Sequence, residues 1–260
     1  MGVPVVRREG VEADDVLDFS VNSNPFGPSP AVAHALRSVP LDRYPDREAW
    51  ELRRAIAHRL GISPHEIVAG NGAAELIQML ALAYLNPHDD VLVLGPTFGE
   101  YERACRLMGA RVHVWAASAE DAFAVDVEAV GYLLQTVQPR LFFVCRPNNP
   151  TGCLLPVEAL RSWAEAAPQT LLVVDEAYLA FAAGARSVVD LGQPNIACLR
   201  SMTKDYALAG LRLGYVAAHR AVVEALRRVQ PAWNVNALAQ AAGLAALADQ
   251  DHLNETLAAL

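Results

Sequence analysis

The chain carries twenty arginines but a single lysine, Lys204. A lysine amine can lose its proton when its surroundings lower its pKa, and it can then attack a carbonyl carbon, whereas a guanidinium stays protonated. A single lysine in a chain that otherwise uses arginine suggests a task that needs an amine, such as imine formation. The count alone leaves chance open as the alternative, because a lone lysine must stand somewhere.

Asp175 directly follows the apolar run Leu171–Val174. A carboxylate at the end of a buried strand would lie in a poorly solvated crevice, where it needs a cationic partner. A protonated pyridine nitrogen is such a partner, and the ring that carries it can accept electrons from a carbanion. A helix cap is the other interpretation that this residue alone allows. Tyr178, about one helical turn later, is expected to face the same crevice.

Two further segments have the residue types that bind a phosphate. The sequence G-N-G-A-A-E at 70–75 precedes an apolar helical pattern, and a helix N-terminus built from small residues offers backbone N–H groups to an anion. A plain helix cap is the alternative. Glu75 stands where a dinucleotide motif would need its third glycine, which disfavours a nicotinamide site. Arg212, in G-L-R-L-G-Y, could clamp the same phosphate or form an ion pair at a strand start.

The elements that must position these residues alternate along the chain. Helical spacing covers 31–37 and 48–60, follows Gly72, and recurs near 101–108; apolar strands are expected at 91–94, 111–115, 141–145, 171–174, 196–199 and 215–218. This order predicts an α/β fold, with a mostly parallel sheet in a three-layer α/β/α domain. Ligands collect at the carboxyl ends of such strands. The polar segments 95–98, 146–152, 175–178 and 201–204 stand at those ends.

Composition excludes several classes of function. The 260 residues, 53% of them hydrophobic, suffice for one large core. A net charge of -8 without a basic stripe argues against a nucleic-acid partner, and the absence of an apolar run of about 20 residues argues against a membrane span. We expect a cytoplasmic protein. The four cysteines form no C-x-x-C pair and the histidines lack metal-binding spacing, so no metal site is predicted.

Together the motifs resemble one enzyme family. In order they are N-P-F-G at 24–27, R-Y-P-D at 43–46, G-N-G-A-A-E, P-T-F-G-E-Y at 96–101, N-N-P-T-G at 148–152, D-E-A-Y, S-M-T-K and G-L-R-L-G-Y. This set, spread from about Asp18 to Leu247, resembles the fold-type I pyridoxal-phosphate enzymes of the class I/II aminotransferase family. The similarity is to the branch that contains histidinol-phosphate aminotransferase and threonine-phosphate decarboxylase.

The resemblance implies a role for each matching residue. Lys204 would form the Schiff base with pyridoxal phosphate and shuttle the proton, and Asp175 would pair with the pyridine nitrogen. The remaining cofactor contacts would come from Asn149 and Tyr178 on the ring hydroxyl, Phe98 on the ring face, and Gly72, Ala73, Ala74, Ser201, Thr203 and Arg212 around the phosphate. Tyr44 would reach the phosphate of a neighbouring subunit, which implies a homodimer with shared active sites. The expected substrate is a small phosphorylated amine.

The resemblance also sets the expected domains. Residues 1–30 would form an N-terminal arm and 31–260 the cofactor-binding large domain. Related chains continue into a smaller C-terminal domain of about 100 residues, a common domain size. That domain carries the arginine that binds the substrate carboxylate. It is expected to be missing here, since the sequence stops at Leu260, so no residue is assigned this role.

Three functions remain open on the sequence. Segments 18–25, 96–104 and 200–207 lean toward the decarboxylase. Transamination is placed first because it is the commoner chemistry in the broader family. The third alternative is a fragment that binds the cofactor or dimerises without catalysis.

Overall fold

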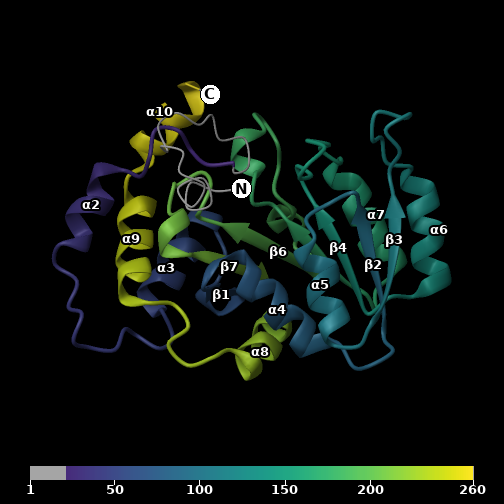
Figure 1. Cartoon of the computed structure of the whole chain (residues 1–260), viewed down its shortest axis with the longest axis horizontal. Helices are drawn as coiled ribbons and strands as arrows, with labels where there is room; N and C mark the ends of the chain where they lie inside the picture. The colour runs from purple at the N-terminus through teal and green to yellow at the C-terminus, as the bar shows by residue number, and fades with distance from the viewer. Residues whose placement is uncertain (1–21, 260) are drawn as a thin grey trace, which may run out of the picture.

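The computed structural model describes residues 22–259, so most of the expected N-terminal arm lies outside the described part. One seven-stranded sheet runs through the molecule in the order β1-β7-β6-β5-β4-β2-β3 (Figure 1). Its strands are β1 (Ile67–Gly70), β2 (Asp90–Gly95), β3 (Arg111–Ala116), β4 (Leu141–Cys145), β5 (Leu171–Asp175), β6 (Ile196–Ser201) and β7 (Gly214–Ala218).

The sheet is mostly parallel, as the alternating pattern predicts. Strands β3, β2, β4, β5 and β6 are parallel to one another, whereas β7 is antiparallel to both β6 and β1. The six predicted strands are all present, each within two residues of its expected bounds at either end. Strand β1 was not predicted, because its four residues I-V-A-G are too few to show a period.

Helices cover both faces of the sheet and give the predicted three layers. They are α2 (Pro30–Leu36), α3 (Trp50–Leu60), α4 (Gly72–Tyr84), α5 (Glu100–Leu107), α6 (Val127–Val137), α7 (Val157–Ala166), α8 (Arg220–Val229), α9 (Ala237–Ala248) and α10 (Gln250–Ala259). One core cluster joins α3, α6, α7 and α9 to the sheet, and another joins α4, α5 and α8 to its opposite face. Figure 1 shows α2 beside α9, away from β3.

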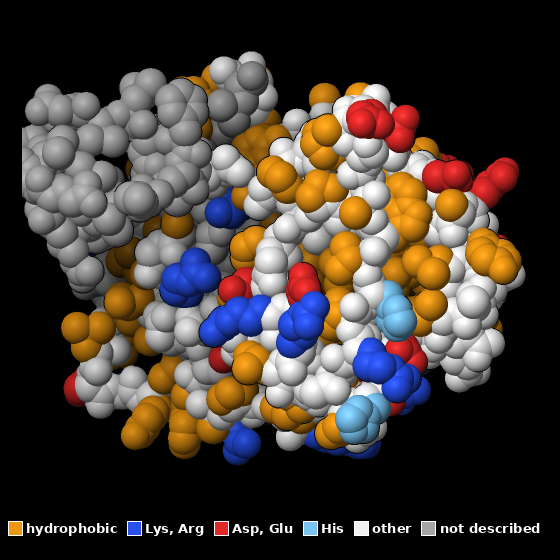
Figure 2. All heavy atoms as spheres, turned by 45° about the vertical axis from the view of Figure 1, so that its right-hand side comes forward, with side chains coloured by type: hydrophobic (Ala, Val, Ile, Leu, Met, Phe, Trp, Pro, Cys, Tyr) orange, Lys and Arg blue, Asp and Glu red, His pale blue; other side chains and the backbone are white. Residues whose placement is uncertain are grey.

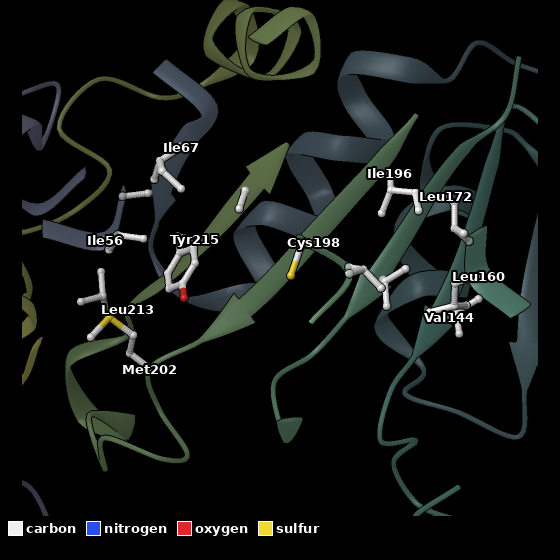
Figure 3. Close-up of a cluster of buried hydrophobic side chains, with 14 of the residues drawn as sticks. Ile56, Ile67, Val144, Leu160, Leu172, Ile196, Cys198, Met202, Leu213 and Tyr215 are labelled. Atoms are coloured by element: carbon white, nitrogen blue, oxygen red, sulfur yellow. The ribbon is translucent and has the colours of Figure 1, made fainter. Parts of the chain in front are cut away.

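The apolar strands are buried on both sides because their residues divide between the two clusters. In β4, Phe142 and Val144 belong to the first cluster, while Leu141 and Phe143 belong to the second. Figure 3 shows part of the first cluster, where side chains of neighbouring strands point to the same side. Two-sided burial explains why these strands read as continuous apolar runs rather than alternating ones.

Helix α3 begins later than the spacing predicts. The pattern suggested a start at Glu48, but Ala49 has a φ of 46° and the helix begins at Trp50. Both carboxylate oxygens of Asp46 accept backbone N–H bonds, from Glu48 at 3.0 Å and from Trp50 at 2.7 Å. These bonds stabilise a turn before the helix, which a hydrophobic period cannot reveal.

The edge strand β3 carries a charged cluster at its start. Asp90 binds Arg111 and His113, which together hold the pKa of that carboxyl well below its usual range. Charged residues on an edge strand discourage pairing with another sheet. Figure 2 turns this side of the molecule forward and shows basic and acidic side chains intermixed on it.

Among the described helices, none is long and apolar enough to cross a bilayer.

Candidate active site

A cavity of about 480 Å³ opens where β4, β5 and β6 end. Ten of the twelve residues singled out from the sequence line it. They are Ala73, Ala74, Phe98, Asn149, Asp175, Tyr178, Ser201, Thr203, Lys204 and Arg212. The other two are Gly72, the first residue of α4, and Tyr44, which lies elsewhere. Parallel strands bring their carboxyl ends to one edge, which is why segments far apart in sequence meet here.

Lys204 lies three residues beyond β6 and is half-buried in this cavity. Its amine lies 5.8 Å from the centre of the Tyr178 ring. Burial lowers the pKa of Lys204, the charge of Arg212 lowers it further, and Asp175 opposes both. A lowered pKa increases the fraction of free amine, which is the nucleophilic form.

Asp175 is the last residue of β5 and is only 5% exposed. Its Oδ1 accepts the N–H of Ala177 at 2.9 Å, and its Oδ2 accepts the hydroxyl of Tyr101 at 2.7 Å. Burial raises the pKa of Asp175 even though both hydrogen bonds lower it. Within residues 22–259 the carboxylate forms no salt bridge. The cavity therefore presents a buried anionic group that a cation would stabilise.

One corner of the cavity has several groups suited to an anion. Helix α4 begins there at Gly72, and the side chain of its N-cap residue, Asn71, forms no hydrogen bond with the first N–H groups of the helix. Gly72 has a φ of +80°, and a Cβ on it would come within 2.8 Å of the Arg212 guanidinium. The hydroxyls of Ser201 and Thr203 lie 2.7 Å apart and are both buried. A helix N-terminus, a guanidinium and two hydroxyls suit a phosphate.

Glu75 holds this helix start in place. Its Oε2 accepts the backbone N–H of Asn71 at 2.7 Å and the side-chain amide of Asn234 at 2.7 Å. From the sequence, Glu75 served only to exclude a dinucleotide motif. Its contact with Asn234 joins residues 159 positions apart, so no local pattern could have indicated it.

The loops around the cavity are tied to one another. Thr97 donates its hydroxyl to the side-chain oxygen of Asn148 at 2.7 Å, which links the loop after β2 to the loop after β4. Phe98 and Asn149, the next residues in each loop, line the cavity. The hydroxyl of Tyr178 accepts a bond from Asn22 at 3.3 Å.

Five residues that line the cavity were not assigned from the sequence: Asn22, Tyr101, Cys145, Pro150 and Ala177. Tyr101 follows Phe98 by three residues, so the tyrosine of P-T-F-G-E-Y was the available signal. Cys145 is buried, and burial raises its pKa to about 12, which keeps the thiol protonated.

Tyr44 lies on the surface outside the cavity. It is 80% exposed and stacks on Trp233 with ring centres 4.7 Å apart. Its expected contact requires a second subunit and stays a prediction.

Comparison with known proteins gives a consistent result. Residues 14–260 match the sequence model of the family described as aminotransferase class I and II. A histidinol-phosphate aminotransferase of Moorella thermoacetica is 40% identical over 268 residues, which cover 98% of this chain and 67% of that relative. The corresponding enzyme of Halorubrum lacusprofundi is 38% identical over 97% of this chain and 70% of its own length.

Solved structures agree with the sequence relatives. The histidinol-phosphate aminotransferase of Sinorhizobium meliloti in complex with pyridoxal-5'-phosphate has a TM-score of 0.89 and 28% identity, covering 99% of this chain and 71% of that one. The aspartate aminotransferase of Thermus thermophilus with maleate has a TM-score of 0.86 and 26% identity, covering 99% of this chain and 70% of that one.

Proposed function

Because the chain belongs to the class I and II aminotransferase family, we propose that it binds pyridoxal phosphate in the 480 Å³ cavity and transfers the amino group of histidinol phosphate. The observation that carries the proposal is that the chain's lone lysine lines the same cavity as Asp175, which is buried without a salt bridge to any described residue. The named substrate rests on the relatives described above, which are histidinol-phosphate aminotransferases.

The cavity fits the cofactor group by group. Asp175 would hold a protonated ring nitrogen, which supplies the cation that this carboxylate lacks among the described residues. Arg212, the start of α4 and the two buried hydroxyls would hold the phosphate. The remaining contacts would be Phe98 on the ring face, Asn149 and Tyr178 on the ring hydroxyl, and Lys204 on the aldehyde carbon.

When bound, pyridoxal phosphate supplies an aldehyde that can take up an amino group and a pyridinium ring that can accept an electron pair. The chain's residues would do the rest. The Asp175 carboxylate would keep the ring nitrogen protonated. The Lys204 amine, whose pKa is lowered, would remove the proton from the substrate's α-carbon and return it at a later stage.

The decarboxylase remains the second candidate because segments 18–25, 96–104 and 200–207 favour it. Histidinol phosphate has no carboxylate, so only a proton can leave its α-carbon, whereas threonine phosphate can lose carbon dioxide. The aminotransferase is preferred because the Moorella and Halorubrum relatives carry that name. The third alternative, a domain without catalysis, is disfavoured because the lysine, the aspartate and the phosphate-binding groups are all present in one cavity.

Two separate assays distinguish these functions. We expect histidinol phosphate with 2-oxoglutarate to yield glutamate, while threonine phosphate alone releases no carbon dioxide. Carbon dioxide release without an amino acceptor would support the decarboxylase. Failure of both reactions in a chain that binds the cofactor would contradict the proposed substrate class.

A homodimer is part of the proposal. Tyr44 and Trp233 form an exposed aromatic pair, and Leu41 nearby in sequence is 82% exposed. Exposed apolar side chains that pack together into a contiguous patch are typical of interfaces. We propose that a second copy of the chain covers them and that Tyr44 reaches the cofactor phosphate of that copy.

A further inference from the structure

Tyr101 is a buried residue that contacts both Phe98, the proposed partner of the cofactor ring, and Asp175. It is the second residue of α5 and has no exposed surface. Its ring stacks on Phe143 with centres 5.1 Å apart and planes at 11°. Phe98 also packs against this ring in a T-shaped arrangement, with centres 5.7 Å apart. This packing leaves the ring little freedom to move, so its hydroxyl has a fixed direction.

That hydroxyl donates to Asp175 Oδ2 at 2.7 Å. Burial and the nearby carboxylate raise the pKa of Tyr101 well above its usual range, so the hydroxyl remains a donor at every physiological pH. The other carboxylate oxygen is held by the Ala177 N–H at 2.9 Å. One donor on each oxygen fixes the plane of the carboxylate and favours its ionised form.

We propose that Tyr101 is a positioning residue, which keeps Asp175 ionised and oriented toward the cofactor's ring nitrogen. The inference rests on the proposed function, since Tyr101 acts on the cofactor only through Asp175. The Tyr101 side chain contacts two other residues that line the cavity: Phe98 packs against its ring, and Asp175 accepts its hydroxyl.

The variant Tyr101→Phe tests this, because phenylalanine keeps the packing and removes only the hydroxyl. The readout is the dissociation constant for pyridoxal phosphate, measured by absorbance titration across pH. We expect weaker binding by roughly 10-fold or more, the usual factor for a hydrogen bond to a charged group. Tyr132→Phe is the matched control, since Tyr132 is exposed on α6.

The pH dependence separates a positioning role from a packing role. Without the hydroxyl, the ionised form of Asp175 loses a donor and its pKa rises further. The carboxylate is then protonated at a higher pH. When pH is lowered, the affinity of the variant for the cofactor should therefore begin to fall at a higher pH than that of the parent chain. The other titratable and charged groups that act on or near Asp175 are Cys145, Glu176, Tyr178, Arg200 and Lys204, and both chains share them.

A double-mutant cycle with Asp175→Asn completes the experiment. If Tyr101 acts through the carboxylate, Tyr101→Phe should change affinity less than about 2-fold in a chain that already carries Asp175→Asn. Equal losses with and without Asp175→Asn, or unchanged affinity and pH profile in the single variant, would overturn the inference alone. A parent chain that takes up no pyridoxal phosphate would overturn the proposed function as well.

A measurement on the unaltered chain tests the inference even if the Tyr101→Phe variant does not fold. The Tyr101 hydroxyl proton should exchange slowly with solvent and give a resolved downfield NMR resonance. Its assignment is checked by its absence from Tyr101→Phe when that variant folds, or by selective tyrosine labelling when it does not. A hydroxyl proton that exchanges freely would contradict the inference.

Discussion

The proposed function needs the ionised form of Asp175, which is the form that lowers the stability of the folded chain. The folded chain raises the pKa of this carboxyl through burial, so its contribution to stability is present at low pH and is lost as pH rises through the folded pKa. The ionised form is therefore the less stable form of this buried group in the cofactor-free chain. Cofactor binding would offset this loss of stability by bringing a positive charge into the cavity.

The variant Asp175→Asn should therefore show two separate effects. Without cofactor it should unfold at a temperature equal to or above that of the parent, because a buried charge has been removed. With cofactor, exchange of the substrate's α-proton with solvent should slow by roughly 10²-fold or more, the scale of losing one electrostatic group in a site. Thermal unfolding and deuterium exchange followed by NMR measure the two. Equal exchange rates would exclude the electron-sink role.

Some residues of the site could be predicted from sequence and others could not. Lys204 was identified by its rarity, and Asp175 by its place after an apolar strand. Tyr101 was not identified because its bond to Asp175 spans 74 residues and depends on how Tyr101 packs against Phe143 of the sheet. Its position in a motif gave no indication of the direction of its hydroxyl.

At the scale of elements, the apolar strands were predictable because burial on both faces of the sheet requires short continuous apolar runs, which are visible in the sequence. The short β1 and the start of α3 were not, since four residues and a local turn leave no periodic trace. The contact between β7 and α4 was also hidden. A Cβ on Gly214 would lie 2.8 Å from the carbonyl oxygen of Arg200 and 3.0 Å from the N of Ala73.

This close approach predicts the effect of Gly214→Ala. Backbone atoms cannot move aside as a flexible side chain can, so the variant should lose about 1–3 kcal/mol of unfolding free energy. It should also displace the start of α4 and weaken phosphate binding. Gly210→Ala is the control, because no described atom lies within 4 Å of a Cβ there. Urea unfolding compares them, and equal stability of the two variants would show that the approach is not tight.

At the scale of the whole molecule, the exposed aromatic pair of Tyr44 and Trp233 predicts self-association. Leu41→Glu should place a charge in the proposed interface and weaken the dimer by roughly 10-fold or more, since an unpaired buried charge is costly. Leu107→Glu, at an exposed position on α5, is the matched control. Sedimentation velocity over a concentration series measures the dimer fraction. A parent chain that stays monomeric would contradict the homodimer.

Lys204, as the residue that takes the cofactor, is the point on which the proposed function depends most. The chain is incubated with pyridoxal phosphate, reduced with sodium borohydride, digested and mapped by mass spectrometry. We predict a visible absorbance band before reduction and a stable adduct on the peptide that contains Lys204, with the band lost in Lys204→Arg. Because the chain has no other lysine, the only competing amine is the N-terminus. An adduct confined to that amine, or no band at all, would contradict the central claim.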